Sequence, residues 1–451
     1  MKSILRVRPK YHFTVKNGWT NDPHGIVSYA GKYQMFFQFC PDSITHQFEV
    51  CWGRATSENL IDWQEEALAI EPTNEEIGCW SGSAIIDDGQ LVLIYTQIPK
   101  LLNHDYNQAF ISSATSNKEL TRWQRRSLEN TLISGPPQNL DLIAFRDPFV
   151  WSDKDGWKAV IGAGIREYGG AMLQYSSSDL ETWKYDGVAA KRSSEELAGA
   201  WTAKIWECPQ LLCVDDVWVL FISVCDDPPN REESHLQYIA YTIGEYDGIE
   251  FTPGNWFQYS FGKVVYATTS FKDSDGKQNL LSWMRETDNV APEGSPWASS
   301  MSLPLSISIS DGRLHTSFHK NLDSVITKEL AIKSEEHQAL GGAFRLKISM
   351  CRNHSQNEST ISLISPENRV LILNKTDELL VYSENVLQFR IPANNLMEMG
   401  SSLDLVLDHE TLELLWNKNS GIGALRLFPS ENWLLDVDNL DLECCSVKVF
   451  T

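Results

Sequence analysis

The feature that most constrains the fold of this chain is a turn motif that recurs every 60 residues. It is a polar run that closes on a leucine and then a tryptophan, and its tryptophans are Trp63, Trp123 and Trp183. Each copy follows a strand-like run, so each is interpreted as a polar turn with the leucine and the tryptophan packed beneath it. A repeat of this length made of short strands is typical of a β-propeller whose blades are four-stranded sheets.

The sequence between the turns favours short strands over helices. Aromatic and β-branched runs occur at 32–39, 90–96, 157–161 and 217–224, whereas long helical periodicity is absent. At about 60 residues a blade, residues 10–318 hold five blades, of which the fourth and fifth are the least regular. From about residue 331 short alternating strands, such as 344–350, are typical of a β-sandwich. We therefore predict an all-β chain, with a five-bladed β-propeller catalytic domain at 1–318 and a C-terminal β-sandwich domain at 330–451.

The composition argues against several classes of partner. The 451 residues carry a formal charge of −22, which disfavours nucleic acid and anionic membrane surfaces. No window approaches 18 apolar residues, and Met1–Lys10 lacks the apolar segment of a signal peptide. The nine cysteines form no C-x-x-C pair, which is typical of reduced thiols. We expect a cytoplasmic protein; its oligomeric state stays open, with a homodimer among the options.

Three acidic residues lie one or two positions before a proline, at sharp stops in the predicted strands. They are Asp22 in Asn-Asp-Pro-His-Gly, Asp147 in Arg-Asp-Pro and Glu207 in Glu-Cys-Pro. Because proline lacks a donor and fixes φ, each acid is expected at a rigid strand end and not inside a central strand. The repeat assigns them to the first, third and fourth blades. Since the inner strands of a propeller converge on one axis, the three side chains are expected to meet at one mouth.

The neighbours of these acids predict different protonation states. Asp22, in a turn with exposed amides, is expected to stay ionised, as a nucleophile must. Glu207, among apolar neighbours, is expected to have the raised pKa that a general acid needs. Arg146 is expected to keep Asp147 ionised, which suits substrate binding. The residues alone therefore indicate either a carboxylate-based glycosidase or a sugar-binding propeller.

The same segments closely resemble the signatures of glycoside hydrolase family 32, which includes invertases, fructan hydrolases and sucrose-6-phosphate hydrolases. The family's Trp-Met-Asn-Asp-Pro-Asn-Gly motif is similar to Trp19–Gly25, its Arg-Asp-Pro motif to Arg146–Pro148 and its Glu-Cys motif to Glu207–Cys208. Further matches follow in order at Phe37–Gln38, Cys51–Gly53, Trp80–Ser83 and Trp297–Pro304. The resemblance covers most of residues 10–318, and beyond them only a sandwich character is shared.

This resemblance implies a retaining double displacement that releases terminal β-D-fructofuranosyl units from sucrose or short fructo-oligosaccharides. It implies that Asp22 is the nucleophile, that Glu207 is the acid and base, and that Asp147 binds fructose hydroxyls and stabilises the transition state. The substrate contacts that it implies are polar ones from Asn21, Gln38, Ser81 and Arg146, and apolar walls from Trp80 and Trp283. The expected partner is a small carbohydrate. No metal or other cofactor is expected, because this chemistry needs none and the sequence has no clustered ligand set.

Several departures from the family pattern leave the substrate open. Thr20 and His24 lie in the first motif, Arg54 replaces a histidine and Leu305 an arginine. His24 is interpreted as a turn residue that adopts the left-handed region as asparagine does. Arg54 is interpreted as a solvated or carboxylate-paired strand residue, with phosphate binding as the alternative.

Four other functions therefore remain as hypotheses. They are a sucrose-6-phosphate hydrolase, a fructan exo-hydrolase acting on inulin or levan, an inverting arabinanase or xylosidase of the five-bladed type, and a sugar-binding propeller without activity. The choice between hydrolysis and transfructosylation is open as well.

Overall fold

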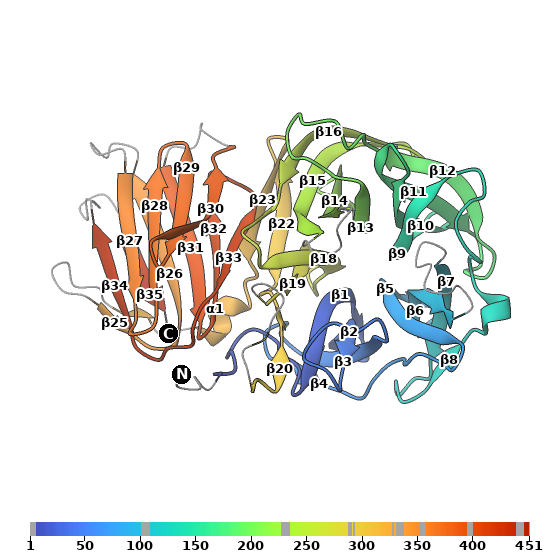
Figure 1. The fold of residues 1–451 in the computed structure, drawn as a ribbon, viewed down its shortest axis with the longest axis horizontal. Helices are drawn as coiled ribbons and strands as arrows, with labels where there is room; N and C mark the ends of the chain where they lie inside the picture. The colour runs from blue at the N-terminus through green and yellow to red at the C-terminus, as the bar shows by residue number, and fades with distance from the viewer. Residues whose placement is uncertain are drawn as a thin grey trace.

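The structure is a computed structural model. The residues that it describes are 6–100, 109–226, 235–286, 291, 294–326, 329–330, 338–351, 358–394, 400–438 and 446–450. Within them, five sheets surround a common centre and two further sheets lie face to face beside them (Figure 1). The all-β prediction of a five-bladed propeller followed by a sandwich is confirmed.

Each blade is an antiparallel sheet whose first strand lies nearest the centre of the propeller (Figure 1). Blade 1 contains β1 (Gly18–Tyr29), β2 (Lys32–Cys40), β3 (Cys51–Ser57) and β4 (Gln64–Glu65). Blade 2 contains β5 (Glu76–Asp87), β6 (Gln90–Pro99), β7 (Phe110–Ser116) and β8 (Trp123–Arg125), and a short helix, η3 (Leu128–Asn130), follows it. Blade 3 contains β9 (Leu142–Asp153), β10 (Gly156–Ile165), β11 (Gly169–Ser177) and β12 (Lys184–Lys191). Blade 4 contains β13 (Ile205–Val214), β14 (Val217–Cys225), β15 (Leu236–Tyr246) and β16 (Phe251–Gln258). Blade 5 contains β18 (Val265–Lys272), β19 (Gln278–Met284), β22 (Leu305–Ser310) and β23 (Arg313–Phe318), with β21 (Ser300–Met301) paired to β19.

The repeated motif is the turn between the third and fourth strands of blades 1, 2 and 3. Its leucines, Leu60, Leu120 and Leu180, are buried and have φ values of 68°, 55° and 61°. An Asn or Asp side chain caps each turn: in blade 1, Asn59 Oδ1 accepts the N–H groups of residues 61 and 62 at 3.0 and 2.8 Å, and Asn117 and Asp179 cap the turns of blades 2 and 3 in the same way. Blades 4 and 5 have short Asp-Gly turns at the same place, with φ values of 102° and 69° at Gly248 and Gly312. These two blades were less regular in sequence because their turns need neither the leucine nor the tryptophan.

The sandwich consists of two sheets that enclose an aliphatic core, including Leu346, Ile361, Leu405 and Trp416. One sheet has the order β17 (Ser260–Phe261), β33 (Ile422–Arg426), β32 (Thr411–Trp416), β31 (Gly400–Asp408), β26 (Ala343–Cys351), β35 (Ser446–Phe450) and β24 (Glu329–Leu330). The other has the order β25 (Gln338–Leu340), β34 (Trp433–Asp438), β27 (Glu358–Ile364), β28 (Arg369–Lys375), β29 (Glu378–Ser383) and β30 (Val386–Pro392). The last propeller strand ends at Phe318, and the helix α1 (Leu322–Val325) leads to β24.

Contacts between distant parts of the chain close the propeller and attach the sandwich. The short strand β20 (Trp297–Ala298), which lies between β19 and β21 in the chain, pairs in parallel with the start of β1. The segment before blade 1 contacts the sandwich, where Arg6 pairs with Glu410 at 2.6 Å and with Glu286 of the propeller at 2.5 Å. The propeller segment β17 also pairs with the sandwich strand β33. These contacts hold blades 1, 4 and 5 in fixed positions relative to the sandwich.

Candidate active site

All five inner strands have an irregularity in their pairing about one blade length apart. The unpaired positions are 21–22 in β1, 81 in β5, 147–148 in β9, 208–209 in β13 and 267 in β18. Such β-bulges leave a residue outside the ladder and turn a side chain toward a site. The fold thus presents side chains from five blades at one level of the central channel.

The three acids therefore lie inside strands, and the expectation that each sits at a strand end is wrong. Asp22, Asp147 and Glu207 belong to β1, β9 and β13, at or next to the bulges. Proline is tolerated in these strands because an innermost strand has a free edge over most of its length, where a missing N–H costs no ladder bond. Asp147 also has a φ of 65°, a conformation that a non-glycine residue adopts rarely.

A closed ring of hydrogen bonds holds the Asp22 carboxylate. Ser81 Oγ donates to Asp22 Oδ2 at 2.7 Å, and Asn21 Nδ2 is 3.2 Å from Asp22 Oδ1. Gln38 joins the other two, since its Oε1 accepts from Asn21 at 2.7 Å and its Nε2 donates to Ser81 Oγ at 2.9 Å. Thr20 Oγ1 donates to the backbone carbonyl of Gln38 at 3.1 Å. Four of the residues singled out in the sequence, from β1, β2 and β5, are thus brought together.

Cys208 of blade 4 contacts both Asp147 of blade 3 and Asp22 of blade 1. The backbone N–H of Cys208 donates to Asp147 Oδ2 at 3.0 Å, and its Sγ lies 3.6 Å from that atom and 3.7 Å from Asp22 Oδ2. The N–H of Asp147 donates to Thr96 Oγ1 at 2.8 Å. Cys208 itself has a φ of 45°, so the backbone is held in an unusual conformation at both residues.

Both oxygens of Glu207 have partners. Arg146 donates to Oε1 through Nε at 3.0 Å and through Nη2 at 2.6 Å. The phenol of Tyr266, on β18 of blade 5, donates to Oε2 at 2.7 Å and lies 3.2 Å from the carbonyl oxygen of Val224. Since the phenol has one proton, it can serve the carboxylate or the carbonyl, but not both at once.

The protonation states differ from those that the sequence predicted. Burial raises the pKa of Asp22, and repulsion by Glu207 adds to the rise. Burial, with repulsion by Glu207 and Asp22, raises the pKa of Asp147 to about 7 even though Arg146 opposes it. Burial alone would raise the pKa of Glu207, but the Arg146 cation and the hydrogen bond from Tyr266 outweigh it and lower that pKa.

The pKa of Asp147 is thus raised although Arg146 was expected to keep this residue ionised, and the prediction of a raised Glu207 pKa is wrong for the free site. Arg146 directs its guanidinium across to Glu207 of the next blade and lowers the pKa there, whereas burial and the two neighbouring carboxylates raise the pKa of Asp147.

The two tryptophans predicted as walls border the same group of residues. Trp283 is buried on β19 and meets Trp19 edge-to-face, with ring centroids 5.8 Å apart. Trp80 is half-buried on β5 and stacks on Phe48, with centroids 6.1 Å apart and an interplanar angle of 22°. Trp80 Nε1 also donates to the carbonyl of Phe48 at 3.2 Å. These rings pack with Cys208 and Tyr266 in one cluster beside the carboxylates.

The structure changes the interpretation of His24 and favours one of the two interpretations of Arg54. The left-handed φ of the first motif belongs to Gly25, at 75°, and His24 is a buried ring that packs on Trp52 with centroids 3.9 Å apart, so the turn interpretation of His24 is wrong. Arg54 is buried in blade 1, where its Nη1 donates to Gln34 at 3.0 Å and its Nη2 lies 3.8 Å from Glu66. That pairing agrees with a carboxylate-paired strand residue. Burial lowers the pKa of both His24 and Arg54.

Two residues of this site were absent from the predicted set. Tyr266 resembles any core aromatic in a strand, but it follows Glu207 by 59 residues, which is the blade repeat. Cys208 was noticed only as part of the Glu-Cys motif. Reading one position per inner strand, at the spacing of the bulges, is the signal that would have found both.

The arrangement can support acid–base and nucleophilic chemistry on a neutral, polyhydroxylated ligand. It combines three carboxylates, one guanidinium, aromatic walls and the neutral side chains of Asn21, Gln38 and Ser81, which hydrogen-bond to one another. Because Asp22 and Glu207 come from different blades with different partners, they can carry different charges at the same pH.

Comparison with known proteins gives this site a family. The sequence model described as "Glycosyl hydrolases family 32 N-terminal domain" matches residues 12–317. The sucrose-6-phosphate hydrolase of Escherichia coli is 27% identical over 93% of this chain and 89% of that protein. The raffinose invertase of Escherichia coli is 32% identical over 68% of this chain and 63% of its own length, so the chain spans less than two thirds of that relative.

Solved structures share the fold over both parts of the chain. A family 32 β-fructofuranosidase of Bombyx mori, solved in complex with sucrose, has a TM-score of 0.83 at 24% identity and covers 98% of this chain and 93% of that one. The sucrose-6-phosphate hydrolase of Lactobacillus gasseri has a TM-score of 0.82 at 22% identity, with the same coverage. Likeness at this level of identity concerns the fold.

Proposed function

The chain belongs to glycoside hydrolase family 32 and is a hydrolase of the β-fructofuranosidase type; we propose that it releases terminal β-D-fructofuranosyl units from sucrose or short fructo-oligosaccharides with retention. The observation that carries this proposal is the meeting of Asp22, Asp147 and Glu207, from three blades, around one guanidinium. The proposed substrate is a small neutral carbohydrate.

In the proposed first step, an Asp22 carboxylate oxygen attacks the anomeric carbon of the fructosyl unit. The bond to the leaving oxygen breaks, and that oxygen takes a proton from Glu207. In the second step Glu207 removes a proton from water, the water oxygen attacks the same carbon, and Asp22 leaves as a carboxylate. Asp147 accepts hydrogen bonds from sugar hydroxyls, and the ring of Asn21, Gln38 and Ser81 keeps Asp22 in position.

Glu207 must gain a proton before it can act, because its pKa is lowered in the free site. We propose that the substrate supplies the change: hydroxyls that accept from Arg146 weaken the Arg146–Glu207 pair, and closure of the site by the sugar removes water. Both effects raise the pKa of Glu207 toward that of a working acid. Tyr266 can then turn its proton to the Val224 carbonyl, so neither protonation state of Glu207 leaves the phenol unpaired.

Two assays test this function. Fructose release is measured from sucrose, sucrose 6-phosphate, 1-kestose, inulin and levan, and transfer to methanol is used to determine the configuration of the methyl fructoside. The proposal predicts the highest kcat/KM on sucrose or kestose and a methyl β-fructofuranoside. An α-configured product would mean inversion, as in the arabinanase type, and would overturn the mechanism.

A second candidate is hydrolysis of sucrose 6-phosphate, which the names of several relatives favour, among them the sucrose-6-phosphate hydrolase of Escherichia coli. Against it, Arg54, the basic residue considered for the phosphate, is buried in blade 1 with Gln34 and Glu66. A dedicated site would gain binding energy from the phosphate. A kcat/KM at least tenfold higher on sucrose 6-phosphate than on sucrose would therefore establish the second candidate in place of the first.

We further propose a cytoplasmic location. It is supported by six cysteines in the described part of the chain that are free thiols, five of them buried. Cell fractionation with an antibody against the intact chain tests this, and recovery from the medium would contradict it. None of the described helices is long and apolar enough to cross a membrane.

A further inference from the structure

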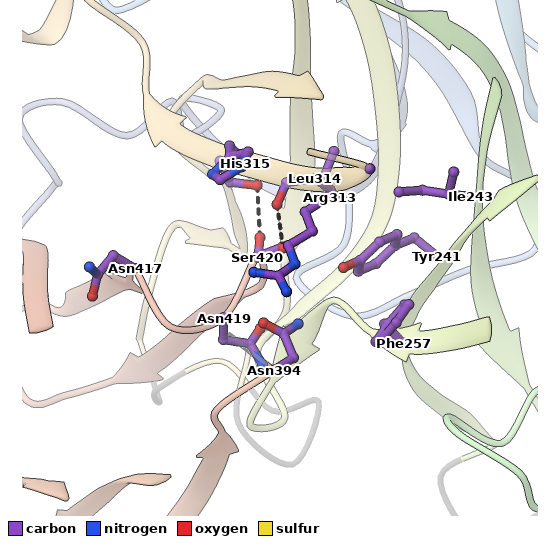
Figure 2. Close-up of a pocket in the computed structure, with 12 residues that line it drawn as sticks. Tyr241, Ile243, Phe257, Arg313, Leu314, His315, Asn394, Asn417, Asn419 and Ser420 are labelled. Carbon is purple, nitrogen blue, oxygen red and sulfur yellow. Dashed lines mark hydrogen bonds between the residues drawn. The ribbon is translucent and has the colours of Figure 1, made fainter. Parts of the chain in front are cut away.

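A second recess lies apart from the carboxylates, where blades 4 and 5 meet the sandwich. Three parts of the chain form it: strands β15 and β16 of blade 4, the β22–β23 hairpin of blade 5, and sandwich loops at 394 and 417–420 (Figure 2). Its volume is about 160 Å³. The carboxylates, in contrast, lie on the inner strands that surround the centre of the propeller (Figure 1).

One side of the recess is aromatic. The rings of Tyr241 and Phe257 stack with centroids 5.3 Å apart and planes inclined by 25°. Tyr241 is buried, whereas Phe257 is half-buried. Figure 2 shows the two rings together on one side of the recess. An aromatic side of this kind offers an apolar surface to the C–H face of a sugar ring.

The opposite side is polar and firmly held. Asn419 Nδ2 donates to the carbonyl of Pro392 at 2.7 Å, and its Oδ1 accepts the N–H of Gly421 at 2.7 Å. Ser420 donates to the carbonyl of Leu314, and Thr316 donates to the carbonyl of Ser420 at 2.7 Å. These bonds tie the sandwich loop to blade 5, so the recess exists before any ligand binds.

Amide and guanidinium groups face the space between these sides. Arg313, Asn394 and Asn417 are exposed at the edge, and in Figure 2 the guanidinium of Arg313 projects between Tyr241 and Asn394. An amide offers two donors and an acceptor, and a guanidinium offers five donors, which suits a ligand rich in hydroxyls.

The charge and the size of the recess narrow the class of ligand. None of the described residues that line it is acidic, although the chain has 60 acidic residues. The recess therefore does not suit a cation. Its volume is below the roughly 300–1,000 Å³ of sites for drug-sized ligands, which limits it to about one ring.

We propose that this recess is a second, non-catalytic carbohydrate site that binds one sugar ring of a fructoside. The C–H face of the ring lies against Phe257, and its hydroxyls contact Arg313 and Asn394. The rest of an oligosaccharide extends into solvent, so the site retains a chain or its products on the enzyme. The inference rests on the proposed function only in the choice of fructosides as the probe.

The test is binding to the full-length Asp22→Asn protein, which prevents turnover. Titration calorimetry with 1-kestose, and crystals soaked in the same sugar, are expected to show two occupied sites per chain. Arg313→Ala and Asn394→Ala each weaken binding at the recess at least tenfold and leave the other site unchanged. Arg166→Ala, an exposed arginine on blade 3, is the matched control and changes neither. Thermal unfolding of each variant verifies folding, and the soaked crystals of the parent protein give an answer even if a variant fails to fold.

A recess that stays empty in the soaked crystals overturns the inference, and so does a second site that survives both substitutions. Preferential binding of inorganic phosphate at Arg313 overturns it as well, because the recess would then be an anion site. The proposed function fails separately. Sugar in the recess of a protein that hydrolyses no fructoside would refute the function and support the second site, while hydrolysis with an empty recess would do the reverse.

Discussion

Removal of the Tyr266 hydroxyl is expected to change the pH at which the enzyme works. In the free site the phenol donates to Glu207 Oε2 at 2.7 Å and thereby stabilises the ionised carboxylate. A hydrogen bond to a charged group contributes about 1.5–3 kcal/mol. Tyr266→Phe should therefore raise the pKa of Glu207, because the ionised carboxylate loses this stabilisation.

The sign follows from the role of Glu207. It must be protonated to act as the acid, so activity falls on the alkaline side as Glu207 ionises. A raised pKa moves that alkaline limb of kcat/KM to higher pH. In the protonated state the wild-type phenol can donate to the Val224 carbonyl, so the hydroxyl favours the ionised form specifically.

The assay is the pH profile of kcat/KM on sucrose for the wild type and the variant, with thermal unfolding to verify the fold. The matched control is Tyr246→Phe, whose phenol also has two acceptors, Gln174 at 2.6 Å and the carbonyl of Gly248 at 3.0 Å, but no carboxylate. A profile for Tyr266→Phe that coincides with those of the wild type and the control would refute the argument that Tyr266 sets the protonation of Glu207.

Three further outcomes follow from contacts in the structure. Ser81→Ala removes the 2.7 Å hydrogen bond that lowers the pKa of Asp22, so the acid limb of the kcat/KM profile should move to higher pH and kcat should fall by about tenfold. An unchanged acid limb would contradict this. Gly25→Ala places a Cβ 2.5 Å from Ala84 at a φ of 75°, so the free energy of unfolding in urea should fall by more than ~1 kcal/mol, and an unaltered midpoint would contradict it. His12 is buried between Asp408 and Glu413, and these carboxylates raise its pKa to about 9. Its ion pairs therefore stabilise the fold by ~3 kcal/mol below pH 6.5, and this stabilisation is lost as the pH rises through 9. Urea titrations across this interval should show the decline in wild type and little of it in His12→Gln.

The sequence predicted those features that repeat or that depend on local chemistry. The spacing of Trp63, Trp123 and Trp183 located three turns because the same Asx-capped, left-handed leucine turn recurs in blades 1, 2 and 3. The convergence of Asp22, Asp147 and Glu207 followed from blade register alone, and the structure brings them together as expected.

The features that the sequence could not predict depend on side chains that cross between blades. Arg146 reaches Glu207 from blade 3 and Tyr266 reaches it from blade 5, and these two contacts lower the pKa of Glu207. Neighbours in sequence gave the wrong sign because the nearest charge in space is not the nearest in the chain. The strand bulges were missed for a related reason, since proline marks an edge strand as readily as a strand end.

The central claim is that Asp22 attacks the fructosyl carbon, and trapping the covalent intermediate tests it most directly. Glu207→Ala is treated with a fructoside whose leaving group needs no protonation, so that the first step proceeds while the second, which lacks its base, is slow. The mechanism predicts that mass spectrometry finds one fructosyl residue attached to the peptide that contains Asp22, and that Asp22→Asn abolishes the label. A fructosyl group on another residue, or rapid turnover with inverted product and no labelled peptide, would contradict it.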